Sequence, residues 1–476
     1  MTLSVASMAR RHLAVALALA LFGPGAALAA TSKEKALEAR VAQLEAQVHE
    51  LLNAQKQQQA QIEDTKTRVA DTQTEVAAAK TQVADAKAKV DKIEKAPKTF
   101  TTGPGLSVAF HGFINANAFG QSNTFNYGNG SNAEYPVAGS RGELSGVDIR
   151  NTRFWLDITG AKFGENWTGG GRIEMDFFGG FNGAGAYSLS QPTPRLRQAY
   201  LDVGNAGSGT NIRVGQQWDL LFPIDMVPDS LTHVAFPLGY GTGLIGWRYP
   251  GVVLSQNFGD GGSGVKWRAD VGVFEGSWNN QGAAVNHLTY GNAGFRPQLE
   301  ARLHAEGANW SAFAAAHYAS IDLKGVAGTD PTPIKASLDS VGYEVGAAFR
   351  PGPWNFKALA YTGTGLGPVF GAMSQFGDID ETGGYFQAGY KLNKNWSVNA
   401  FFAEAKPVRD DVVRWLGRGA SGATRNEQTA LNLIYADGPY KFGIEAMHDR
   451  LHVTAVGKAG TDTSGNQVSL SGQYSF

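Results

Sequence analysis

The sequence predicts an all-β protein, an antiparallel transmembrane β-barrel of sixteen strands, with an α-helical coiled coil before it. The last strand carries the first observation: one face holds Val468, Leu470, Gly472, Tyr474 and Phe476, and the other holds only polar residues. Lipid on one face and a wet lumen on the other give a barrel strand this pattern. After the coiled coil the apolar period changes from 3.5 to 2. In addition, the mature chain has no continuous apolar segment of the about 20 residues that a membrane-spanning helix needs.

Residues 1–29 are predicted to be a signal peptide. Arg10, Arg11 and His12 precede a short apolar run, and Ala27-Leu28-Ala29 forms a small-x-small cleavage site. The apolar run is too short to span a bilayer, so the prediction is export and not a membrane anchor.

The composition agrees with an exported barrel and excludes several other classes. The chain contains no cysteine, which excludes disulfides, thiol chemistry and cysteine metal sites. It holds 61 glycines and 11 % aromatic residues, which supply turns and strands. A formal net charge of −1 gives no electrostatic reason to expect a nucleic-acid partner.

Residues 31–97 are predicted to form a coiled coil. Apolar positions step by four and three without a break, a 3.5 period that implies a left-handed supercoil. The seam contains Leu37, Val41, Leu44, Val48, Leu51, Gln55, Gln58, Ile62, Val69, Val76, Val83 and Val90. Gln55 and Gln58 place a polar layer in the seam, which fixes register at a cost in stability. A helix with one apolar stripe cannot bury that stripe alone, so self-association is expected; the seam leaves the number of helices open.

Residues 98–105 are predicted to be a linker, and residues 106–476 the barrel. Seven short turns are expected near 161–166, 204–209, 259–264, 305–309, 350–353, 393–395 and 436–439. Eight longer connections are expected near 120–146, 179–194, 218–243, 275–296, 323–337, 363–383, 405–424 and 450–465. Fifteen connections join sixteen strands, and alternation of short turns with long outer loops is typical of bacterial outer-membrane barrels. A barrel of sixteen strands is wide enough to enclose a water channel.

Aromatic residues near the predicted strand ends are candidates for interfacial girdles. They are Tyr200, Trp247, Tyr249, Trp310, Tyr318, Trp354, Tyr390, Trp396, Tyr435, Tyr440 and Tyr474. Tyr474 and Phe476 are also the aromatic residues of the membrane-embedded closing strand.

The connection over 218–243 is too apolar for a freely solvated loop, and it carries Asp219, Asp225 and Asp229. It follows the fifth predicted strand and is therefore the third outer loop. With the preceding segments Gln198-Ala199-Tyr200-Leu201 and Ile212-Arg213-Val214-Gly215-Gln216-Gln217, it resembles the strand pair and constriction loop of trimeric porins. The resemblance implies that this loop folds into the barrel and narrows it.

The combination of signal peptide, coiled coil and porin-type barrel resembles the DcaP-like porins. That resemblance implies a homotrimer in the outer membrane of a Gram-negative bacterium, in contact with outer-membrane lipid, with the coiled coil in the periplasm. It also implies transport of small hydrophilic and mostly anionic solutes such as dicarboxylates. The expectation that the coiled coil contains three helices rests on this resemblance.

A basic wall is predicted on the lumen-facing parity of the early strands. It consists of Arg153, Arg172, Arg195, Arg197, Arg213, Lys266, Arg268 and Arg302. Stacked guanidinium groups attract anions and pair with carboxylates in a planar fork. Opposite the acidic loop they would create a transverse field across the constriction. The alternative is a general pore of mixed charge, in which lumen charges neutralise one another.

The sequence predicts neither an enzyme nor a cofactor or metal site. It lacks G-x-S-x-G, H-E-x-x-H and a P-loop. His448 and His452 are four residues apart, but a metal site needs further ligands. Two more alternatives stay open: a structural anchor or adhesin whose coiled coil contacts the cell wall, and an exported soluble β-sandwich. The alternation of polar-in and apolar-out residues argues against the sandwich.

Overall fold

The computed structural model describes residues 32–95, 99–103, 105–126, 128–179, 192–259, 264–275, 297–323, 334–373 and 375–476. The predicted signal peptide over 1–29 lies outside these residues. The chain divides into two compact units, residues 1–96 and 97–476, and each is described by itself. None of the helices in the described part of the chain is long and apolar enough to cross a membrane.

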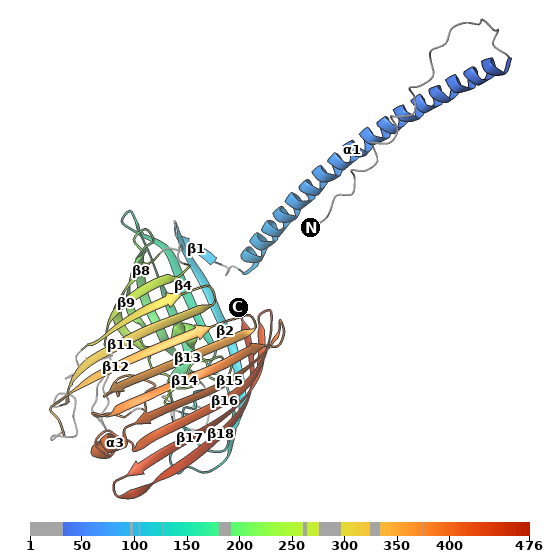
Figure 1. The fold of residues 1–476 in the computed structure, drawn as a ribbon. Coiled ribbons are helices and arrows are strands. Elements are labelled where there is room, and N and C mark those ends of the chain that lie inside the picture. The colour runs from blue at the N-terminus through green and yellow to red at the C-terminus, as the bar shows by residue number, and fades with distance from the viewer. Residues whose placement is uncertain are drawn as a thin grey trace, which may run out of the picture. The chain divides into compact units, whose positions relative to one another are not determined.

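The first unit contains one helix, α1 (Ser32–Lys95), of 64 residues (Figure 1). It contains neither glycine nor proline, so nothing in its sequence breaks the helix. Its apolar stripe is uncovered: Leu37, Leu44 and Leu51 are 68 %, 56 % and 69 % exposed. The helix is therefore as predicted, whereas its association into a coiled coil stays a prediction.

The second unit is a β-barrel (Figure 1). Its strands are β1 (Thr99–Gly103), β2 (Leu106–Gln121), β3 (Leu144–Asp148), β4 (Arg153–Phe163), β5 (Trp167–Gly179), β6 (Thr193–Asn205), β7 (Thr210–Trp218), β8 (Arg248–Phe258), β9 (Lys266–Phe274), β10 (Gln298–Glu306), β11 (Trp310–Asp322), β12 (Ser337–Phe349), β13 (Trp354–Thr364), β14 (Asp380–Lys391), β15 (Trp396–Pro407), β16 (Ala423–Asp437), β17 (Tyr440–Ala455) and β18 (Lys458–Ser475). Two 3-10 turns, η1 (Gly130–Asn132) and η3 (Ile224–Met226), and a short helix, α3 (Arg409–Trp415), lie in the connections.

Every wall strand pairs antiparallel with its neighbours, and the sheet closes on itself. β3 and β4 both pair with β2, one beyond the other, so together they fill one wall position. β18 pairs with β2 from Gln467↔Gln121 to Ser475↔Phe113. Beyond that register, Phe476 and Gly112 exchange two backbone hydrogen bonds of 2.9 and 3.1 Å. The wall has sixteen strand positions, which confirms the predicted barrel; β1 is an extra strand paired with β2.

Two segments differ from the sequence prediction. Residues 99–103, expected in the linker, form β1, which agrees with the strand preference of Thr99-Phe100-Thr101. The prediction of a long connection over 450–465 is wrong, because β17 and β18 continue through these residues and meet at a two-residue turn, Val456-Gly457. Cross-strand ion pairs such as Arg450–Asp462 stabilise the strands there, and Gly457 supplies the positive φ of 66° that the turn needs.

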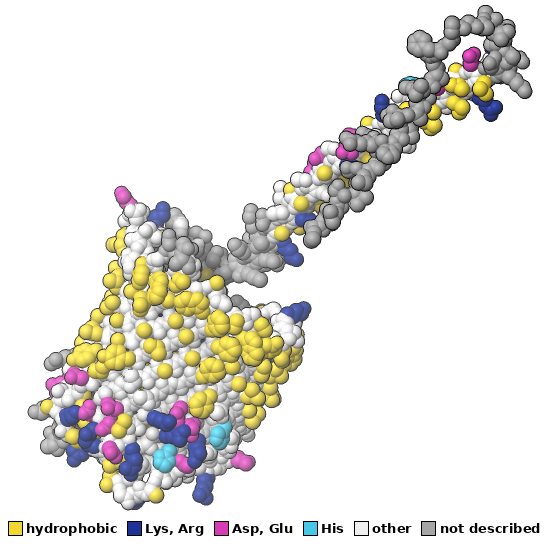
Figure 2. Space-filling view, in the orientation of Figure 1, with side chains coloured by type: hydrophobic (Ala, Val, Ile, Leu, Met, Phe, Trp, Pro, Cys, Tyr) yellow, Lys and Arg dark blue, Asp and Glu magenta, His cyan; other side chains and the backbone are white. Residues whose placement is uncertain are grey.

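The two faces of the wall have opposite chemistry. Adjacent residues show this directly, because Val345 is 56 % exposed while Glu344 is 1 % exposed. Figure 2 shows apolar side chains over the middle of the barrel's outer surface, and charged and histidine side chains beyond that belt, toward the β17–β18 hairpin. An outer face of this kind matches a lipid environment flanked by water.

Candidate functional site

The connection between β7 and β8 folds into the barrel and packs against the far wall. Leu221, Met226, Leu244 and Ile245 are at most 1 % exposed. They belong to one apolar cluster with inward side chains of the later strands, including Phe313, Leu359, Tyr385, Phe401, Ala430 and Met447. We call residues 219–247 the inward loop. The inward loop is rich in apolar side chains, and it packs against the wall because this removes its apolar surface from water.

One close approach of backbones seats the inward loop against β14. Gly243 has φ of 142°, and a Cβ atom on it would lie 2.3 Å from the carbonyl oxygen of Gly384. Only glycine fits such a position, so this stretch of the loop lies directly on the strand.

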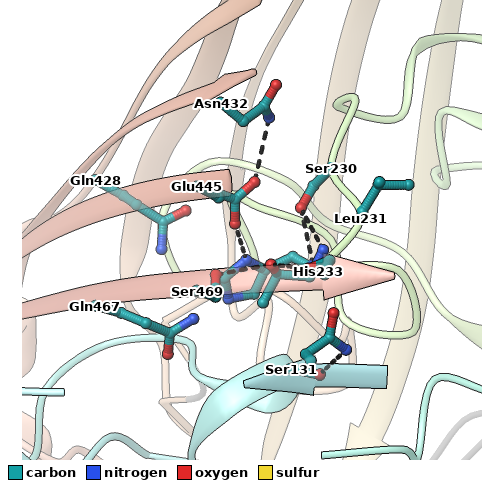
Figure 3. A network of polar contacts seen from close by, with 12 residues as sticks. Ser131, Ser230, Leu231, His233, Gln428, Asn432, Glu445, Gln467 and Ser469 are labelled. Atoms are coloured by element: carbon teal, nitrogen blue, oxygen red, sulfur yellow. Dashed lines mark hydrogen bonds and ion pairs between the residues drawn. The ribbon is translucent and has the colours of Figure 1, made fainter. Parts of the chain in front are cut away.

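Polar contacts fix the tip of the inward loop, residues 229–233, to β16, β17 and β18 (Figure 3). His233 Nδ1 lies 2.7 Å from Glu445 Oε1, and Glu445 Oε2 accepts a hydrogen bond from Asn432 at 3.2 Å. Ser230 Oγ accepts from the backbone N–H groups of Thr232 and His233. The hydroxyl of Thr232 lies 2.8 Å from that of Ser469. A buried network with these partners holds the tip in one position.

The three aspartates of the inward loop all have partners. Asp229 accepts from Lys357, Asn355 and Gln387 at 2.8, 3.0 and 2.7 Å. Asp225 lies 2.7 Å from His304 Nε2, and this hydrogen bond lowers the pKa of Asp225. These contacts anchor the loop to β10, β13 and β14.

Asp219 is 1 % exposed and caps the start of the inward loop. It accepts from the backbone N–H groups of Phe222 and Trp247, both at 2.9 Å. Burial raises the pKa of Asp219 well above its usual range, with Glu300 as a further cause. None of the three aspartates is therefore a free carboxylate opposite the basic wall.

The predicted basic residues separate into two groups. Arg172, Arg213, Arg268 and Arg302 pair with Asp157, Asp202 and Asp270, while Lys266 is exposed at the start of β9. Arg153, Arg195 and Arg197 lie together beside the inward loop, around two carboxylates of β5. We call these three arginines with Arg248 the guanidinium cluster.

The guanidinium cluster contains four arginines but only two carboxylates, and three of the arginines lie within 4.0 Å of Glu174 or Asp176. Arg197 is 1 % exposed and bonds Glu174 at 2.5 Å and Asp176 at 2.7 Å. Arg195 also bonds Asp176 at 2.7 Å. Arg153 Nε is 4.0 Å from Glu174, and that nitrogen has no hydrogen-bond partner among the described residues. The cluster therefore carries an excess of two positive charges.

Arg248, at the start of β8, is the functional residue that sequence reasoning missed. It is 5 % exposed, and its Nε and Nη1 find no acceptor in the described part of the chain. Its guanidinium lies 4.1 Å from the ring centre of Trp247 and 4.9 Å from that of Trp218. Cation–π contacts replace a carboxylate here. The signal was an arginine between two aromatic residues directly after the inward loop.

Trp247 and Tyr249 do not belong to an interfacial girdle. Trp247 packs on Phe370 at 4.3 Å between ring centres, and Tyr249 is 8 % exposed and donates to the carbonyl of Pro368. Both are inward because the loop, and not lipid, supplies their apolar partner. The girdle prediction is wrong at these two positions and at Tyr200, whose ring lies 4.1 Å from the guanidinium of Arg213 on the face opposite the exposed Leu201.

A second connection also enters the barrel. Residues 366–373, between β13 and β14, are bound to the inward loop by two backbone hydrogen bonds of 2.8 Å, from Gly241 to Gly371 and from Gly246 to Phe370. The ring of Phe370 also meets that of Tyr240 at 5.1 Å. The obstruction inside the barrel is therefore built from more than the inward loop, and Phe125 and Ala133 of the connection between β2 and β3 join the same apolar cluster.

A cavity of about 570 Å³ lies between the inward loop and the short turns. Its lining includes Arg153, Arg197 and Asp229, and it reaches Lys391 and Lys441 beside two of the turns. No group of three potential metal-ligating side chains occurs in the described ranges. His448 and His452 bind Asn466 and Asp462 instead.

No protein-family model and no curated protein matches this chain. Among solved structures, the outer membrane channel DcaP of Acinetobacter baumannii matches with a TM-score of 0.59 and 18 % identity, over 79 % of this chain and 99 % of that one. OmpT of Vibrio cholerae matches with 0.49 and 12 %, over 80 % and 100 %. Salmonella typhi OmpF in complex with daunomycin matches with 0.48 and 12 %, over 80 % and 100 %. The DcaP match agrees with the strand pairing and supports the fold: this chain is a closed antiparallel barrel with sixteen strand positions.

Proposed function

We propose that this chain is an outer-membrane diffusion channel that prefers small hydrophilic anions. The observation that carries the proposal is the guanidinium cluster beside the inward loop, in which three arginines share two carboxylates and the fourth, Arg248, has no carboxylate partner in the described part of the chain. Uncompensated positive charge in a narrow lumen attracts anions and repels cations.

The anion preference in this proposal depends on excess charge and not on a transverse field. The aspartates at 219, 225 and 229 are used in anchoring the loop, so they do not oppose the arginines. Dicarboxylates fit this arrangement because guanidinium groups pair with carboxylates through two parallel hydrogen bonds. The proposal also includes a homotrimeric assembly and a periplasmic coiled coil, both of which are tested separately from conduction. It includes no catalytic step.

A second function, a structural anchor, is favoured by one observation. The dry core of the inward loop, with Leu221, Met226 and Leu244 at 0 % exposure, reaches the far wall and reduces the open cross-section. A barrel closed in this way would hold the coiled coil to the membrane without conducting.

Single-channel recording separates the two functions. The mature protein is purified in detergent and inserted into a planar bilayer under a salt gradient. Conductance in steps of three, with a reversal potential toward the anion value, supports the channel. Replacing Arg153, Arg195 and Arg197 with alanine should then abolish the preference. A folded, heat-modifiable oligomer without conductance would contradict the channel and favour the anchor.

A further inference from the structure

The cavity beneath the inward loop lies on the side of the short turns, away from the long connections. Pro353, Tyr390 and Lys391 line it and adjoin the turns after β12 and β14. Ala436 and Lys441 line it from the two sides of the turn between β16 and β17. At about 570 Å³ it falls within the range of small-molecule sites, about 300–1,000 Å³.

The cavity lining carries more positive than negative charge. Arg153, Lys391 and Lys441 line it, and neither lysine is within ion-pair distance of a carboxylate in the described ranges. The lining carboxylate, Asp229, is already neutralised by Lys357 and accepts from two amides. An anion in the cavity would therefore meet cations at both ends, from the guanidinium cluster and from the turn lysines.

One side of the cavity is apolar because the inward loop supplies it. Trp218, Phe222, Val227, Leu231 and Val234 all line it. Prolines at 228, 237 and 353 add rigid apolar surface. A small inorganic anion would leave this surface wet, whereas a ligand with a hydrocarbon body would cover it.

We propose that this cavity binds an organic anion with a compact apolar body and one carboxylate, and that the anion reaches it from the short-turn side. The carboxylate pairs with Arg153 or the turn lysines, and the body lies on the apolar side of the inward loop. The inference deepens the proposed function by naming a solute class, but binding itself does not require that the channel conducts.

The test uses the full-length protein and cyclohexanecarboxylate as the probe. Isothermal titration in detergent gives its affinity, and addition to each side of a planar bilayer gives its block of the current. Acetate keeps the charge without the apolar body, and cyclohexylammonium keeps the body with the opposite charge. Lys391→Gln/Lys441→Gln is the test variant. Lys394→Gln is its matched control, because Lys394 is an exposed turn lysine outside the lining.

The probe should bind at least tenfold more tightly than acetate or cyclohexylammonium, and it should block more strongly from one side. The test variant should lose about tenfold in affinity while the control keeps it, since an ion pair to a ligand contributes roughly that much. If acetate bound as tightly as the probe, the apolar surface would have no role in binding. If cyclohexylammonium bound as tightly, the positive charges of the lining would have none. No binding to a conducting channel would overturn the inference and leave the proposed function intact. Binding without conductance would keep the site and remove the channel.

Discussion

Individual residues of the inward loop hold the loop in place through polar contacts with the barrel wall. Asp229 is the clearest case, because its carboxylate receives three donors from β13 and β14, its N–H donates to Gln387, and its carbonyl accepts from Asn432. A loop residue with five polar contacts to four residues on three strands cannot move without breaking most of these contacts. The acidic residues of this loop therefore set its position, and the arginines set the local charge.

Replacing Asp229 with alanine should loosen the tip of the inward loop. Lys357 would keep only the carbonyl of Val227 as a partner, and leaving such groups unpaired costs about 1–3 kcal/mol. We expect a lower temperature of heat modification on gels and noisier single-channel currents. Asp410→Ala, at an exposed position in α3, is the control. Quiet currents and unchanged thermal stability in Asp229→Ala would show that the loop is held elsewhere.

Replacing Arg248 with glutamine should weaken anion preference without weakening the fold. The substitution removes a buried charge that has no carboxylate partner, so its loss from the folded state is not costly. One unit charge about 8 Å from a permeating ion in water is worth about 0.5 kcal/mol, so anion permeability should fall about twofold and cation permeability should rise about twofold. The anion-to-cation permeability ratio should therefore fall about fivefold. Reversal potentials in a salt gradient measure this ratio. Arg425→Gln, an exposed position of β16, should leave it unchanged, and equal ratios in all three proteins would remove Arg248 from the selectivity mechanism.

At the level of elements, strands were predictable from the sequence and loop contacts were not. A period of two reports which face of a strand meets lipid, as Leu431 and Asn432 illustrate at 57 % and 4 % exposure. The apolar run of the inward loop likewise predicted that it packs on something. The partner of each charged side chain is not encoded locally: Asp225 meets His304 across 79 residues, and no spacing rule contains that pair.

The second inward connection shows the same limit. Residues 366–373 belong to the predicted long connection over 363–383, and their position depends on hydrogen bonds with backbone groups of the distant inward loop. Arg248 was missed for a related reason, because one of its two ring partners, Trp247, was predicted to lie at the membrane interface and the other, Trp218, is 30 residues away. In both cases, contacts between residues far apart in the sequence determine the local structure.

Replacing Phe370 with alanine should widen the passage between the two inward loops. The ring packs on Trp247 and Tyr240, and removing it separates the two loops where they touch. Truncating a large buried ring costs about 3–5 kcal/mol, and this half-buried ring should cost less. We expect a larger single-channel conductance. Phe386→Ala, which removes a ring from the lipid-facing side of β14, is the matched control. A conductance identical to that of the parent protein would mean that the narrowest point lies elsewhere.

At the scale of the whole molecule, the two units make different demands on their surroundings. The barrel satisfies its strand edges by closing, and its apolar belt requires lipid. The helix α1 satisfies its backbone internally but leaves its apolar stripe exposed along its length, with Val41, Val48 and Ile62 each about half exposed. An isolated helix of this kind gains stability only by packing, so the stripe supplies a reason for the chain to associate.

Substituting the seam of α1 tests that association in the full-length protein. Leu44→Gln/Leu51→Gln removes two leucines from the seam, each worth about 1.5–3 kcal/mol when buried in a coiled coil. The temperature at which the proposed oligomer dissociates in detergent, followed by light scattering after size exclusion, should fall while the heat modification of the barrel is unchanged. Ala46→Gln/Asn53→Gln introduces the same side chain on the opposite face of the helix and should leave the oligomer intact. If both double variants dissociate at the parent temperature, the exposed stripe does not hold the assembly together, and the barrel walls must do so.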